Sequence, residues 1–254
     1  MANLIHPVLR FCLETFFIYQ ILATKSLKTE SMKVYKKLKE GDLIGARKEV
    51  SYLVGRDTEN LDESEVAKAD VETIAENTAD GVIAPMLFIA IGGAPLGFAY
   101  KAVNTLDSMV AYKNEELINI GFFSAKMDDI CNFIPARFAA VMLMIASLIL
   151  RFDFKGAVKI FKRDRFAHLS PNSAQTEAVA AGALQIQLGG THNYFGKAVV
   201  KPTIGDDIRP VEYEDIKRTN QLLYVSAVLS MAVCCLITVS YTHLRAHETR
   251  HDLV

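Results

Sequence analysis

Hydrophobic residues in this chain are gathered into long runs that are separated by charged stretches. The clearest runs cover 138–150 and 222–239. Extended back to Ile130, the first run reaches about twenty residues, the length at which a helix crosses a bilayer. The second is rich in Leu, Val, Ala and Cys, as spanning helices are. A shorter run at 8–23 contains two charged residues, which predicts either a tilted span or a buried helix.

A further apolar run, 82–100, is interrupted repeatedly by glycine and proline. The interruptions are Pro85, Gly92, Gly93, Pro95 and Gly97. At membrane depth such breaks are tolerated where the backbone is buried or lines a cavity, so they favour a re-entrant helical hairpin. The Lys/Arg count favours a full crossing instead, because 25–48 and 151–165 are basic and 101–129 is not. We expect the hairpin, because the breaks allow the chain to turn back.

The charged stretches predict helices and loops outside the hydrocarbon. We expect a helical hairpin over 25–48 that breaks at Gly41–Asp42, a helix from Asp62 through Thr78 whose capping box uses Glu65, a basic surface helix over 151–167, a small-residue helix over 174–184, and loop or short strand over 189–210. The fold class is therefore all-α: a multi-pass α-helical membrane protein with cytoplasmic helical and loop segments.

The domain organisation follows from the same pattern. Residues 1–239 form a single membrane-embedded domain. The tail, 240–254, resembles a reading frame through a sequencing adapter, and it contains three of the six histidines. We interpret it as a non-native tail and not as a histidine-rich metal site.

Composition excludes several classes of function. The net charge is −1, and no basic stripe is interleaved with aromatic residues, so nucleic acid is not an expected partner. The four cysteines lack the paired spacing of a zinc site and suggest a reducing compartment. Residues 1–7 do not have the features of a secretory signal.

Three carboxylates, Glu72, Glu76 and Asp80, recur every four residues and therefore project from one face of a helix. Like charges at this spacing repel, and the ordinary explanation is a solvated helix face. Here Asn77 and Asp80 lead directly into the apolar run at Val82, so the row meets the membrane boundary. Polar groups at that boundary more often line a site.

Two further groups of polar residues flank the apolar runs. Asn104 and Asp107 follow the broken run, Asp128 and Asp129 precede Ile130, and Asn132 and Arg137 lie one and two turns into that helix. A capped turn and an acidic helix N-terminus explain them equally well. Adjacent carboxylates point in different directions, so at most one of the two aspartates shares a face with Asn132.

Arg163, Asp164 and His168 lead into Ser170–Pro171–Asn172. An Arg/His cluster at a helix end suits phosphate binding, although a lone histidine is more often structural. There is no P-loop, GxSxG, HExxH or CxxC motif. The residues alone thus indicate a membrane enzyme with several carboxylates and an Arg/His cluster.

The ordered set of motifs is more specific. Its blocks are Val54–Thr58, Glu72 through Asn77 to Pro85, Ala102–Met109, Asp128–Asp129 with Asn132 and Ile134–Arg137, Arg163–Asp164 with His168 and Ser170–Asn172, and Gly189–Gly190 with Tyr194, Gly196 and Gly205–Asp206. In this order they resemble the adenosylcobinamide-phosphate synthase (CbiB/CobD-type) family over Leu13–Val239. Members begin with additional apolar segments, and this chain starts at about the third.

The resemblance implies ATP-driven amide formation between adenosylcobyric acid and aminopropanol or its phosphate, with Mg²⁺, at the cytoplasmic side of the cell inner membrane. It implies catalytic roles for Glu72, Glu76, Asp80, Asp107, Asp128 and His168, and metal binding by Glu76, Asp80, Asp128 and Asp129. Substrate binding falls to Arg56, Asp57, Asn77, Asn104, Asn132, Arg137, Arg163, Asp164 and Asn172. The choice between free and phosphorylated aminopropanol stays open, as does a homo-oligomeric state.

Two other classes remain as alternatives. A magnesium-dependent membrane prenyltransferase also pairs acidic helices with a diphosphate, but it needs two Asp-x-x-x-Asp signatures, and only the row Glu72, Glu76 and Asp80 approaches one. A transporter or structural membrane subunit would place polar groups along a path. Internal repeats would support that class, and the sequence has none that we detect.

Overall fold

The computed structural model describes residues 6–110, 118–194 and 196–251, and most of these are helical. The elements are α1 (Pro7–Ile21), α2 (Thr24–Lys39), α3 (Leu43–Ser51), α4 (Glu63–Asn77), the π-helix η2 (Thr78–Ile83), α5 (Ala84–Val110), α6 (Ile118–Ile149), α7 (Phe154–Asp164), α8 (Ser173–Leu184), β1 (Leu188–Tyr194), β2 (Lys197–Ile204) and α9 (Tyr213–His251). Three helical stretches are long and apolar enough to cross a bilayer: Glu63–Met109, Gly121–Ile149 and Tyr213–Ser240. The predicted all-α membrane class is confirmed.

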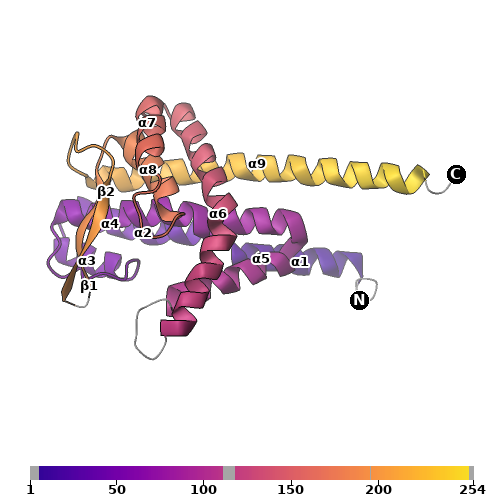
Figure 1. Ribbon diagram of the computed structural model, residues 1–254, viewed down its shortest axis with the longest axis horizontal. Coiled ribbons are helices and arrows are strands. Elements are labelled where there is room, and N and C mark those ends of the chain that lie inside the picture. The colour runs from indigo at the N-terminus through magenta and orange to yellow at the C-terminus, as the bar shows by residue number, and fades with distance from the viewer. Residues whose placement is uncertain (1–5, 111–117, 195, 252–254) are drawn as a thin grey trace.

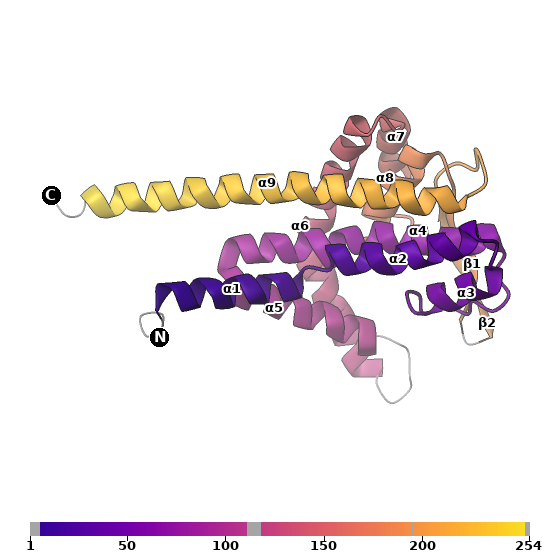
Figure 2. The same cartoon turned by 180° about the vertical axis from the view of Figure 1, so that it is seen from behind.

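Most of the long helices run roughly parallel to one another. Helix α4, η2 and the first part of α5 form a continuous rod, α2 and α9 run beside it, and α1 lies against α5 (Figures 1 and 2). Helix α6 runs across this direction and contacts η2, α5, α8 and α9. The predicted break at Gly41–Asp42 and the capping box of Asp62 and Glu65 are both present.

Helix α5 turns back on itself at Gly92 and Gly93, whose backbone angles are not helical. Gly93 has φ +67°, a left-handed conformation that glycine adopts without strain. The stretch 84–91 before the turn rises about 12 Å at ~1.5 Å per residue, less than half of a hydrocarbon core of ~30 Å. The chain therefore reverses at Gly92–Gly93, as a hairpin requires, and its re-entry into the membrane stays a prediction.

The two limbs of this hairpin pack tightly. The Tyr100 ring stacks on Phe88 with centroids 4.8 Å apart. Gly97 lies so close to the first limb that an added Cβ would come within 2.6 Å of Cγ1 of Ile89. The return limb consequently carries Asn104 and Asp107 back toward the end of the rod from which α5 starts.

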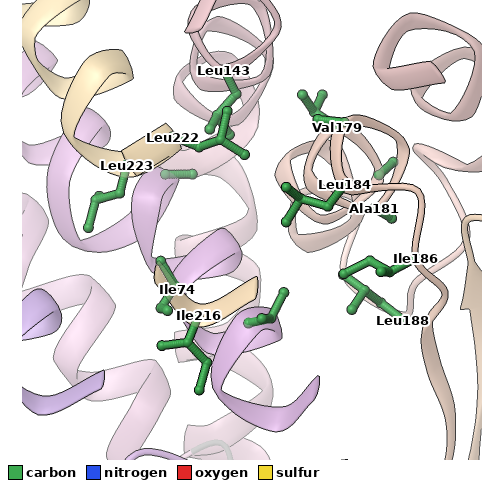
Figure 3. Close-up of a cluster of buried hydrophobic side chains, with 14 of the residues drawn as sticks. Ile74, Leu143, Val179, Ala181, Leu184, Ile186, Leu188, Ile216, Leu222 and Leu223 are labelled. Carbon is green, nitrogen blue, oxygen red and sulfur yellow. The ribbon is translucent and has the colours of Figure 1, made fainter. Parts of the chain in front are cut away.

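A core of aliphatic side chains joins α4, α6, α8 and α9 beside the rod. Figure 3 shows Ile74 beside Ile216, Leu143 beside Leu222, and Ile186 beside Leu188. Every residue of α8 is buried. Its Gly182 lies directly against the backbone of Gly156 in α7, so that the two helices cross at close range.

The segment that the sequence left as loop or strand forms an antiparallel hairpin. Its register runs from Leu188 opposite Ile204 to Tyr194 opposite Lys197, with an irregularity between Gly189 and Gly190. Gly189 has φ +75°, and a Cβ there would collide with the carbonyl oxygen of Pro202. Glycine is thus required, and the bulge aims the Gly189 N–H at Glu72 of α4.

Candidate active site

A small polar cavity lies between α4, α8, the β-hairpin and the loop that precedes α4. Its volume is about 160 Å³, below the roughly 300–1,000 Å³ of pockets that take drug-sized ligands. The charged and polar side chains that line it are Arg56, Glu72, Thr73, Glu76, Asn77, His168, Glu177, His192, Tyr194 and Lys201. Cations and carboxylates therefore meet in a space that suits a small ligand.

Arg56 holds one wall of the cavity together. Its Nη2 lies 2.8 Å from Oε2 of Glu72, and its Nη1 lies 2.6 Å from Nδ1 of His192. The other oxygen of Glu72 accepts from the Gly189 N–H at 2.7 Å. Because the Arg56 side chain is only 6% exposed, this ion pair is shielded from water and positions the β-hairpin against α4.

Burial governs the protonation of the groups around the cavity. Burial and the Arg56 charge lower the pKa of His192 to about 4, so its ring is neutral and accepts from Arg56. Burial also lowers the pKa of His168, and it raises the pKa of Glu177, which Glu76 and Glu72 raise further. Burial acts to lower the pKa of Lys201, but Tyr194, Glu76 and Glu177 together raise it.

A second set of acidic side chains lies beside the cavity. Asp128 accepts from Asn132 at 2.9 Å and from Asn104 at 3.3 Å. Asp80 and Asp107 lie within electrostatic range of Asp128, and Glu76 lies within range of all three. We call Glu76, Asp80, Asp107 and Asp128 the acidic group. Glu76 belongs both to this group and to the cavity, so the two are contiguous.

Of the expected row of Glu72, Glu76 and Asp80, the first two line the cavity, but Asp80 does not. Asp80 lies in the π-helix that begins at Thr78, whose i→i+5 hydrogen bonds change the rotation per residue. It is within electrostatic range of Glu76, Asp128 and Asp107, and the single row of three carboxylates stays a prediction. Wide turns of this kind are frequent at functional sites.

Asp129 and Asp128 have different hydrogen-bond partners, as expected for adjacent carboxylates. Its Oδ1 accepts from Ser170 at 3.0 Å, and its backbone oxygen accepts from Asn172 at 2.9 Å. Arg137 donates to Oδ1 of Asn172 at 3.0 Å. These bonds hold the 170–172 loop on α6, and the next residue, Ser173, donates to Glu76 at 2.9 Å.

The expected Arg/His phosphate cluster is divided in the structure. His168 lines the cavity, but Arg163 does not, because Asp164 and Asp206 bind its guanidinium group. Asp164 also accepts from the Gly205 N–H at 2.8 Å, which secures the end of β2. Asp57 accepts from the Gly196 N–H at 2.8 Å and is likewise outside the lining. Arg163, Asp164 and Asp57 fasten the β-hairpin.

The proposed metal ligands do not make a site by themselves. Within residues 6–109, 121–194 and 196–240, no three or more His, Cys, Asp or Glu side chains converge closely enough to hold a metal ion. Of the expected set, Asp129 accepts from Ser170 of the 170–172 loop, although it lies within electrostatic range of Asp107 and Asp128. An ion at the acidic group would need further ligands from a substrate or water.

Sequence reasoning missed three ionisable residues of the cavity. Glu177 lies in a helix whose small residues predict burial but do not indicate a functional site. His192 and Lys201 lie in a segment for which strand and loop were equally favoured. Only the alternation of Gly190, His192 and Tyr194 could have indicated a strand with one face toward a site.

Comparison with known proteins places the chain in a family. A family model described as "CobD/Cbib protein" matches residues 1–223. The "Cobalamin biosynthesis protein CobD" of Clostridium perfringens is 54% identical over 93% of this chain and 75% of that protein. The protein of the same name from Streptococcus sanguinis is 51% identical over 97% and 77%.

A relative with a different printed name matches over the same part of the chain. The "Cobalamin biosynthesis protein CbiB" of Salmonella choleraesuis is 48% identical over 92% of this chain and 73% of that protein. No solved structure matches the chain. A family match over most of the length and relatives near half identity agree with the ordered motifs, and the chain belongs to the CobD/Cbib protein family.

Proposed function

We propose that this chain is an ATP-driven ligase that joins the amino group of aminopropanol, or of its phosphate, to a carboxylate of adenosylcobyric acid. Family membership supports a role as an enzyme of cobalamin biosynthesis. The observation that carries the proposal is the contact between a small polar cavity and an acidic group, which share Glu76. A small amine and two large substrates would need such neighbouring compartments.

The cavity suits the amine better than the other substrates. A nucleotide or a corrinoid is far too large for about 160 Å³, whereas an amino alcohol is not. Glu76 and Glu177 offer carboxylate oxygens to an ammonium group, and Lys201 and His168 lie in the same lining. The corrinoid carboxylate and ATP would then bind outside, over Asp80, Asp107 and Asp128.

The reaction is balanced as an acyl transfer in two steps. An oxygen of the acid attacks the γ-phosphorus of ATP, ADP leaves with the bonding electrons, and an acyl phosphate forms. The amine nitrogen then attacks the acyl carbon, the bond to the phosphate oxygen breaks, and inorganic phosphate leaves. Before this attack the ammonium must lose a proton, for which Glu76 is the proposed acceptor.

Magnesium fits the chemistry of the donor set. Mg²⁺ prefers oxygen ligands and is usually held by one or two carboxylates together with substrate phosphates. Asp80 and Asp128 would hold it, and it would neutralise charge on the ATP phosphates. This arrangement is compatible with the lack of a three-ligand protein site among the described residues.

A reconstituted assay tests the proposal directly. The full chain in liposomes receives adenosylcobyric acid, aminopropanol or its phosphate, ATP and Mg²⁺, and mass spectrometry follows the amide and ADP. We expect equimolar amide and ADP, and a loss of both in Glu76→Gln and Asp128→Asn. The exposed Glu59→Gln serves as the matched control and should keep full activity.

The possible failures of this assay differ in meaning. Amide without ADP would overturn the ATP-driven step. Full activity in both Glu76→Gln and Asp128→Asn would overturn the site but leave the reaction standing. Complementation of a cobinamide-requiring strain, with cobyric acid as sole corrinoid, provides the same comparison in cells.

A further inference from the structure

Helix α6 has two faces of opposite character, and the apolar face points outward. Phe123, Ile130, Ile134, Val141, Ile145 and Leu148 recur at helical spacing and are all exposed. The other face is buried and carries Asp128 and Asn132 together with small residues. A helix of a soluble protein shows the reverse pattern, so this outward face requires an apolar environment.

The direction of α6 is incompatible with that of the other apolar helices. Figures 1 and 2 show that α6 runs across the rod, whereas α1, the first limb of α5 and α9 lie along it. Spanning helices tilt by roughly 0–40° from the bilayer normal. One bilayer therefore does not accommodate both α6 and α9 as crossing helices, although both meet the length and composition of a span.

Charge identifies which of the two does not cross. Arg137 lies near the middle of Gly121–Ile149, so a crossing α6 would place it near the bilayer centre, where a guanidinium group is costly. Its guanidinium carbon lies 3.7 Å from the ring centroid of the exposed Phe133, and it donates to Asn172 of the 170–172 loop. An arginine, an exposed ring and a polar loop suit the depth of the head groups.

We propose that α6 lies in the plane of the membrane interface, with its outward face against lipid and Asp128 and Asn132 on its protein-facing side. The lipid bilayer is the occupant, because α1 and α5 expose apolar side chains of the same kind, including Phe11, Tyr19 and Ile91. A single direction along the bilayer normal then serves α1, the limbs of the α5 hairpin next to the rod, and the crossing helix α9. This arrangement does not depend on the reaction that the protein catalyses.

The absence of tryptophan in the sequence gives a clean test. Phe123→Trp, Ile134→Trp and Ile145→Trp are made singly in the full chain and reconstituted in vesicles of phosphatidylcholine brominated near the head group or deep in the acyl chain. Successive positions are eleven residues apart, which keeps them on one face and separates the outer two by about 33 Å along the helix. Val228→Trp and Val239→Trp on α9 have the same spacing and serve as controls.

We expect the same ratio of shallow to deep quenching at all three α6 positions, with shallow quenching stronger, and different ratios at the two α9 positions. Deep quenching at Ile134→Trp with shallow quenching at the outer two would show a crossing helix and overturn the proposal. No quenching by either lipid would show that protein, such as a second copy of the chain, covers the face, and would also overturn it. The introduced side chains are exposed, and an unchanged melting temperature confirms that each variant folds.

Discussion

The hydroxyl group of Tyr100 lies 2.9 Å from the backbone oxygen of Asp80 and 2.8 Å from Oδ1 of Asn132. It therefore joins three segments: the end of the rod, the return limb of the hairpin and helix α6. Asn132 in turn donates to Asp128. One phenol thus connects the fold of the hairpin to the geometry of the acidic group.

Replacing Tyr100 with phenylalanine should loosen this junction. The variant keeps the ring that stacks on Phe88 but removes the single O–H that the Asp80 backbone oxygen and Asn132 Oδ1 share, a cost of about 1–3 kcal/mol. Chemical unfolding in detergent micelles measures the loss. Tyr19→Phe is the control, because Tyr19 is exposed, and it should be neutral. Equal stability of the two variants would show that the Tyr100 hydroxyl does not hold the segments together.

Arg56→Lys should impair ligation more than its charge suggests. Lysine keeps the positive charge but lacks the forked donors that reach Glu72 and His192 together. We expect a decrease of about tenfold or more in kcat/KM, equivalent to ~1.4 kcal/mol. Arg209→Lys is the control, because Arg209 makes a comparable forked contact with Asp215 away from the cavity. This variant should keep the kcat/KM of the parent, measured per folded protein.

Acid should destabilise the protein through His192. Its pKa of about 4 in the folded state lies below the 6.5 of an unperturbed histidine, so between these values the unfolded chain binds the proton more readily. Stability is therefore complete above about pH 6.5 and falls as the pH decreases toward 4. For His192→Gln, the melting temperature should depend less strongly on pH across this range. An unchanged pH dependence would contradict the assignment.

Adding a methyl group where α7 and α8 cross should destabilise the protein. In Gly182→Ala the new Cβ meets the backbone of Gly156 and Ala157, which a side-chain rotation does not relieve. Overpacking of this kind costs about 1–3 kcal/mol. Gly81→Ala is the matched control, since its Cβ would lie at ordinary contact distances of 3.5 Å and more. A melting temperature equal to the parent's in both variants would mean that α7 shifts freely.

The hairpin predicts the side on which Ser108 is found. Because α5 returns, the exposed Ser108 and the exposed Ser51 should face the same side of the membrane. Single cysteines at these positions, with the four native cysteines replaced, are labelled by an impermeant maleimide in spheroplasts and in lysed cells. We expect protection of both until lysis. Labelling of Ser108→Cys in intact spheroplasts would place the hairpin end in the periplasm.

The sequence predicted the elements well where local chemistry decides them. Asp62 and Glu65 mark a helix start by their own side chains, and Gly41–Asp42 marks a break, so both were found. The reversal at Gly92–Gly93 also followed from residue type. Of the cavity, Arg56, Glu72, Glu76, Asn77 and His168 were among the expected residues, and they all line it.

Other features depend on contacts between distant segments and could not be read from spacing. The phase of Asp80 depends on the π-helix, which α-helical periodicity does not anticipate. Glu177, His192 and Lys201 reach the cavity only because the β-hairpin folds back over α4 and α8. In the sequence Arg163 has the character of a phosphate ligand. In the structure its guanidinium group binds Asp206, forty-three residues later in the chain.

The widened turn at Thr78–Ile83 has a consequence for how the enzyme could be altered. It joins α4 to α5 in an unbroken rod, so that Glu76, which lines the cavity, and Asp80, which belongs to the acidic group alone, follow one another with no loop between them. Deleting one residue there would restore ordinary helical winding and turn Asp80 by roughly a quarter of a turn. The spacing between the compartments is therefore built into helical winding, and a rigid element maintains it without a hinge.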